Sequence, residues 1–187
     1  NKTKGEKNMQ KENREHCIRR FLFGDGNVSR QMVQGAVIAA IYVVLTMIFQ
    51  PISFGPIQFR ISEALCVLPY FTPAAVPGVF IGCLISNMLG GSVIMDVVFG
   101  SFATLIGAIG SRLLRENRYL VSLPPILSNV IIIPWVLKYA YGAEDMIWFM
   151  MITVGIGEIL AIGVLGQLLI TALDKYKIVI FQSKPQA

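Results

Sequence analysis

Six polar side chains interrupt long apolar runs of this sequence or stand at their edges. They are Arg60, Glu63, Asn87, Asp96, Asn129 and Glu158. Runs of this length suit a membrane, where a polar group is costly and marks a candidate functional site. Carboxylate and amide oxygens accept hydrogen bonds, so these residue types suit a small molecule that carries N–H donors. The sequence therefore predicts a polar binding site within an apolar protein.

Glu158 is the most deeply placed of the six. Counted from Met146, where its apolar run begins, it lies roughly 18 Å along a helix, near the middle of a membrane. No basic residue is predicted at the same depth. A ligand, a water molecule or a donor side chain must satisfy the carboxylate, or it stays protonated. We favour a ligand contact for Glu158.

Several of the other five residues have structural alternatives. Arg60 and Glu63 would pair with each other at the start of a helix, and Asn129 would join two helices, as Asn often does in membranes. Asn87 is predicted near the outer end of one helix, and Asp96 lies a few residues into the next. Most of these positions fall in the outer half of the protein, and this clustering favours a binding site.

Signatures of metal binding and catalysis are missing. The three cysteines, Cys17, Cys66 and Cys83, form no CxxC pair, and the single histidine is His16. No HExxH, GxSxG, Walker A or paired-carboxylate motif occurs. We predict no metal, no cofactor, no enzymatic activity and no ATP hydrolysis by this chain alone.

The composition is that of a membrane protein. Of 187 residues, 55% are hydrophobic and 14% are charged, against about 25% charged in soluble domains. The mean hydropathy of +0.64 agrees with this assignment. The net charge of +5 includes a net of +4 in residues 1–30. A basic tail beside an apolar core favours the cytoplasmic membrane surface over nucleic acid.

Apolar runs place the membrane helices. A span needs about 20 apolar residues, and four runs have that scale. They are Met32–Phe49, Val93–Ser111, Leu120–Leu137 and Met146–Leu173. The stretch Ile61–Leu89 is long for one span and short for two, and its prolines predict a turn at Thr72–Gly78.

The distribution of basic residues decides how often that stretch crosses. If it crosses twice, fourteen of the sixteen Lys and Arg residues fall on one side, which is the cytoplasmic pattern. We therefore predict an all-α integral membrane protein with six transmembrane helices and both termini in the cytoplasm. Residues 1–30 form a basic cytoplasmic tail, 31–175 the membrane domain, and 176–187 a cytoplasmic C-terminal tail.

Several motifs resemble one known family. The run from Phe54 to Leu65, Phe-Gly-Pro-Ile-Gln-Phe-Arg-Ile-Ser-Glu-Ala-Leu, is similar to the loop and second helix of the queuosine-precursor transporter (QueT) family. The resemblance covers about residues 30–175. Its supporting motifs are Thr72–Gly78, Ile85–Asn87, Asp96–Ser101 and Gly155–Glu158.

The resemblance implies a function. Such proteins are substrate-binding S-components of energy-coupling factor importers, in the bacterial plasma membrane, and work with a transmembrane coupling subunit and two ATPase subunits. An AxxxA motif on the first helix would contact the coupling subunit, and Ala36 and Ala40 match it. The substrate would be a deazaguanine precursor of queuosine or the base queuine, with Trp135 or Phe99 stacking on it unless they face lipid. The alternatives are an S-component for another small vitamin and a small intramembrane enzyme that uses Asp96 and Glu158.

Overall fold

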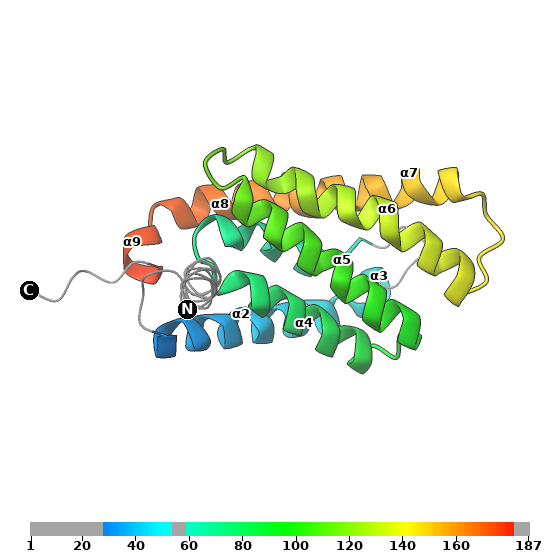
Figure 1. Ribbon diagram of the computed structural model, residues 1–187, viewed down its shortest axis with the longest axis horizontal. Helices are drawn as coiled ribbons and strands as arrows, with labels where there is room; N and C mark the ends of the chain where they lie inside the picture. The colour runs from blue at the N-terminus through cyan, green and yellow to red at the C-terminus, as the bar shows by residue number, and fades with distance from the viewer. Residues whose placement is uncertain (1–27, 54–58, 182–187) are drawn as a thin grey trace, which may run out of the picture.

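The computed structural model describes residues 28–53 and 59–181, and this part of the chain contains helices and no strand. Most of the predicted basic tail, at 1–27, and the first residues of the resemblance motif, at 54–58, lie outside the described residues, as do 182–187. Figure 1 shows the helices running roughly side by side along the long axis of the protein. They are α2 (Val28–Ile48), α3 (Gln50–Ser53), η1 (Ile61–Tyr70), α4 (Ala75–Leu89), α5 (Ile94–Leu113), η2 (Leu120–Ser122), α6 (Leu123–Ala140), α7 (Ile147–Glu158), η3 (Ile159–Gly166), α8 (Gln167–Asp174) and α9 (Lys177–Ile180).

Four helical segments are long and apolar enough to cross a membrane. They are Val28–Ile48, Ile94–Leu113, Leu120–Ala140 and Ile147–Asp174, and they correspond to the four long runs of the sequence. The last is one continuous helical segment made of α7, the π-helical η3 and α8. The predicted all-helical fold, with four of the predicted spans long and apolar enough to cross a membrane, is confirmed, while the predicted count of six and the orientation of the termini stay predictions.

The stretch at 61–89 forms two shorter apolar helices, η1 and α4. The predicted turn at 72–78 extends too far, because α4 already begins at Ala75 and takes Pro77 into its first turn. Proline is tolerated there, since the N–H groups of a first helical turn have no partner within the helix. The actual break is shorter and includes Pro73.

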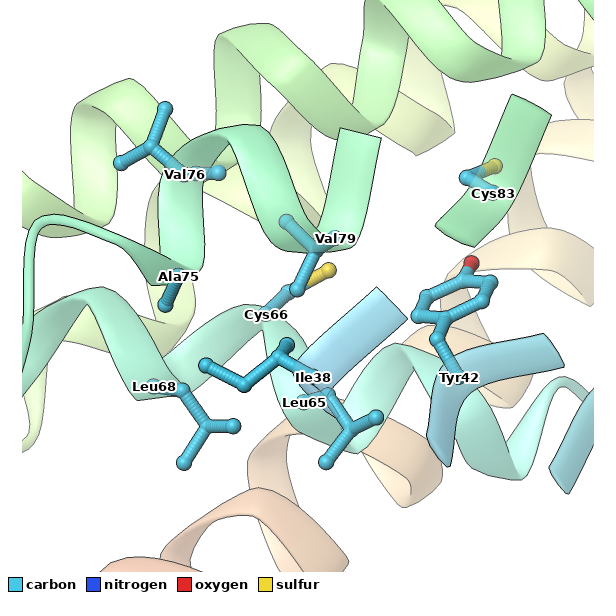
Figure 2. Close-up of a cluster of buried hydrophobic side chains, with 10 residues drawn as sticks. Ile38, Tyr42, Leu65, Cys66, Leu68, Ala75, Val76, Val79 and Cys83 are labelled. Atoms are coloured by element: carbon cyan, nitrogen blue, oxygen red, sulfur yellow. The ribbon is translucent and has the colours of Figure 1, made fainter. Parts of the chain in front are cut away.

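The short helix η1 forms the centre of the protein. It is a 3-10 helix in which every residue from Ser62 to Pro69 is buried, so neighbouring helices surround it. The main core cluster packs its Cys66 against Ile38 of α2 and Val79 of α4. Figure 2 shows these side chains converging, with the Tyr42 hydroxyl pointing toward Cys83.

A close crossing brings α2 against α4. A Cβ atom added at Gly78 would lie 2.8 Å from the carbonyl oxygen of Gly35, which is closer than real Cβ contacts allow. Gly35 and the buried Ala39 therefore belong to the internal α2–α4 contact. Ala36 and Ala40, one residue further along the helix in each case, are exposed on the outside.

The two ends of the bundle differ in character. One end, at the left of Figure 1, holds the start of α2, the α5–α6 connection and α9. Its basic residues are Arg30, Arg112, Arg115, Arg118, Lys175 and Lys177. We call it the basic end. The opposite end holds the α4–α5 turn and the α6–α7 loop, and we call it the α6–α7 end.

Candidate functional site

All six polar residues singled out in the sequence are buried in the structure, none more than 5% exposed. Arg60 and Glu63 lie at the start of η1, Asn87 near the end of α4, and Asp96 in the first turn of α5. Asn129 lies within α6, and Glu158 is the last residue of α7. The structure therefore brings polar groups from five helices into the interior of the bundle.

Arg60 is the positive charge of this cluster. Its Nη2 atom lies 3.6 Å from Oδ2 of Asp96, and the guanidinium also interacts electrostatically with Glu63 and Glu158. The sequence considered an ion pair between Arg60 and Glu63. In the structure Arg60, at the start of η1, forms its ion pair with Asp96 of α5 instead. The sequence placed no basic residue at the depth of Glu158, but in the structure the buried Arg60 interacts electrostatically with it.

Glu63 is held by donors within the protein. Its Oε1 accepts hydrogen bonds from the hydroxyls of Tyr42 at 2.5 Å and Thr104 at 3.4 Å, and its Oε2 accepts one from the Cys66 thiol at 2.9 Å. Both oxygens are therefore occupied. Glu63 joins η1 to α2 and α5, and this geometry favours a role in shaping the site over direct contact with a ligand.

Sequence reasoning missed Tyr42, Cys66 and Thr104. Each lies in an apolar run and resembles an ordinary core residue. For Cys66 the available signal is helical spacing, since Glu63 and Cys66 are three positions apart in η1. Tyr42 and Thr104 lie on other helices, so no sequence spacing connects them to Glu63.

Among the six candidate residues, three have a buried side-chain oxygen without a hydrogen-bond partner within the described part of the chain. These oxygens are Oδ1 of Asn87, Oδ1 of Asp96 and Oε2 of Glu158. Asn129 lies near enough to interact with the Glu158 carboxyl group, and Oε2 of Glu158 remains without a hydrogen-bond partner. Leaving a buried acceptor unsatisfied costs about 1–3 kcal/mol. Three such acceptors from three helices indicate a site for a molecule that donates hydrogen bonds.

Gly100 allows two of these groups to meet. A Cβ atom at Gly100 would lie 3.0 Å from Oδ1 of Asp96 and 3.3 Å from Nδ2 of Asn87. Because Gly100 has no side chain, the Asn87 amide on α4 and the Asp96 carboxylate on α5 can both lie close to the α5 backbone. Within residues 28–53 and 59–181, no three His, Cys, Asp or Glu side chains are grouped to hold a metal ion.

The two aromatic residues considered for stacking lie on the outside of the bundle. Trp135 is 44% exposed and Phe99 is 48% exposed. The Trp135 ring stacks on Tyr139, with ring centroids 6.1 Å apart. The sequence left two roles open for these residues, stacking on a base or facing lipid. Their outward position fits the second role.

A groove of about 310 Å³ runs along the outer surface between α2 and α4. Its walls include Gln31, Gly35, Ala36, Ala74, Pro77 and Ile81. Ala36 lines the groove, and Ala40 is exposed one helical turn further along α2. Small residues on an exposed helix face allow another helix to approach closely, which suits the predicted partner contact.

Comparison with known proteins identifies relatives. The sequence model of a family described as QueT transporter matches residues 32–175. A protein from Lactococcus lactis subsp. cremoris (strain MG1363), called queuosine precursor transporter QueT, is 45% identical over 73 residues. That alignment covers 38% of this chain and 43% of the relative. No solved structure matches the chain significantly.

Proposed function

The chain belongs to the QueT transporter family, and from this premise we propose that it is the substrate-binding subunit of an energy-coupling factor importer for a deazaguanine precursor of queuosine. The single observation that carries the proposal is the set of unpartnered acceptors on Asn87, Asp96 and Glu158. Because the family is one of transporters, the alternative of an intramembrane enzyme is set aside. An S-component for another small vitamin remains the second candidate.

The chemistry of a deazaguanine complements these acceptors. The base presents a ring N–H beside an exocyclic amino group, and carboxylate oxygens accept both kinds of donor. An aminomethyl substituent would add a positive charge. The cluster has three carboxyl groups, Glu63, Asp96 and Glu158, against the single guanidinium of Arg60, so it favours a cationic ligand over an anionic one.

Binding to purified protein tests this function. In detergent, the protein should bind aminomethyl-deazaguanine in a calorimetric titration and should melt at a higher temperature in its presence. Riboflavin, thiamine and biotin should produce neither effect. Mass spectrometry should recover the ligand unchanged. Binding of one of these vitamins in place of the deazaguanine would favour the second candidate.

We also propose the orientation of the protein. The basic end would face the cytoplasm, because cytoplasmic loops carry the excess of Lys and Arg. The two short helices η1 and α4 would together complete a six-helix membrane domain, with η1 shielded from lipid by its neighbours. In this arrangement the α6–α7 loop faces the outside, and the buried Asp96 lies near that end of the bundle, where the substrate arrives.

Cysteine labelling tests this orientation. In a Cys17→Ser background, an impermeant thiol reagent added to intact cells should modify Glu144→Cys in the α6–α7 loop and spare Asn117→Cys in the α5–α6 connection. Cys66 and Cys83 are fully buried and should not react. Glu144 is preferred to its neighbour Gly142, which has a φ of 66° that a cysteine rarely adopts. Labelling of Asn117→Cys from outside would overturn the orientation.

The groove between α2 and α4 is the proposed contact with the coupling subunit. It is apolar, borders the predicted AxxxA pair Ala36 and Ala40, and lies toward the basic end of α2. A coupling subunit could therefore dock on one side of the bundle while the substrate site opens at the α6–α7 end. The two ATPase subunits would attach through that coupling subunit.

A further inference from the structure

A single tyrosine joins the outer ends of α5 and α6. Tyr141 directly follows the last residue of α6. Its hydroxyl accepts a hydrogen bond from the backbone N–H of Val93 at 3.3 Å and donates one to Oδ2 of Asp96 at 3.0 Å. Burial raises the pKa of Tyr141, so at neutral pH the hydroxyl keeps the proton that it donates.

The two oxygens of Asp96 have different surroundings. Oδ2 accepts the Tyr141 hydrogen bond and also lies beside Arg60. Oδ1 is buried without a hydrogen-bond partner among the described residues and lies close to Gly100 and the Asn87 amide. The carboxylate is therefore held by one oxygen and presents the other to the interior.

This asymmetry matters because rotation about the Cβ–Cγ bond of aspartate is soft. Without a directional partner, the carboxylate would sample orientations that turn Oδ1 away from the site. Arg60 supplies charge at 3.6 Å, which is long for a hydrogen bond. Tyr141 supplies the shorter and more directional contact, and its own position is fixed by the Val93 backbone.

We propose that Tyr141 is a positioning residue for substrate recognition, which orients Asp96 so that Oδ1 meets a donor group of the ligand. The inference rests on the proposed function and adds a residue to the site. Tyr141 acts from the α6–α7 end, where the ligand would enter. Its effect on binding should therefore pass entirely through Asp96.

A double-mutant cycle tests this dependence. Tyr141→Phe removes the hydroxyl and keeps the ring. It should weaken calorimetric binding of aminomethyl-deazaguanine by about three- to tenfold, the range expected for one hydrogen bond. In an Asp96→Ala background, the same change should cost less than about twofold, because the group it orients is gone. If the Asp96→Ala variant does not fold, Asp96→Asn is used in its place. The loss of affinity caused by Tyr141→Phe should then be at most half of the loss seen with Asp96 present.

Tyr139→Phe is the matched control. Tyr139 lies two residues earlier, is 69% exposed and stacks on Trp135, so its loss of a hydroxyl should leave affinity unchanged. Equal Tyr141→Phe penalties in both backgrounds, or no penalty with Asp96 present, would overturn the inference while leaving the proposed function intact. Failure of the unmodified protein to bind any deazaguanine would instead overturn the proposed function, and this inference with it.

Discussion

Replacing Glu158 by Gln should weaken the binding of a deazaguanine ligand by well over tenfold while the protein still folds and inserts. Oε2 of Glu158 is buried and has no hydrogen-bond partner in the described residues. A hydrogen bond to a charged group contributes about 1.5–3 kcal/mol, and about 1.4 kcal/mol corresponds to a factor of ten. The amide of Gln keeps the shape but presents a donor where the ligand also donates.

Calorimetric titration of both proteins measures this effect, and melting without ligand measures its structural cost. Glu144→Gln is the matched control, because it makes the same chemical change in the exposed α6–α7 loop and should leave affinity unchanged. If Glu158 is instead a protonated structural residue, the Glu158→Gln variant should keep its affinity and should be more stable than the original protein. Affinities that agree within about threefold, roughly 0.65 kcal/mol, would remove Glu158 from the site and shift recognition toward Asp96 and Asn87.

Replacing both Ala36 and Ala40 by Trp should abolish assembly with the coupling subunit and therefore transport. The two alanines are exposed on α2, and Ala36 lines the groove against α4. An indole at either position would fill the space that a partner helix needs for close approach. Substrate binding by the isolated chain should stay within about twofold of the original, because the polar cluster lies inside the bundle.

Co-purification with tagged coupling subunit, together with uptake of labelled ligand, measures this outcome. Val37→Trp with Ile41→Trp is the matched control. Both residues are exposed, at 51% and 45%, and are spaced like the alanines but turned about 100° around the helix axis. Normal assembly of the Ala36→Trp, Ala40→Trp variant would place the interface on another face.

Local sequence was sufficient for the four long membrane helices of this protein. The long apolar runs at 32–49, 93–111, 120–137 and 146–173 predicted the helices now seen there, because chain length and hydropathy alone decide whether a segment suits a bilayer. The polar residues within them also stood out in the sequence. Each is costly to bury, so its presence in an apolar run is informative before any fold is known.

Tertiary structure alone decided which of these residues meet and what each one contacts. Glu63 looked like a partner for Arg60, yet its oxygens are occupied by Tyr42 and other donors from within the core. Arg60 instead lies beside Asp96, thirty-six positions away in the chain. These pairings depend on how each helix is rotated and how deeply it sits against its neighbours, which is set by packing between segments distant in sequence. For the same reason only the fold could show that Asp96 turns one oxygen toward Tyr141 and leaves the other open to the interior.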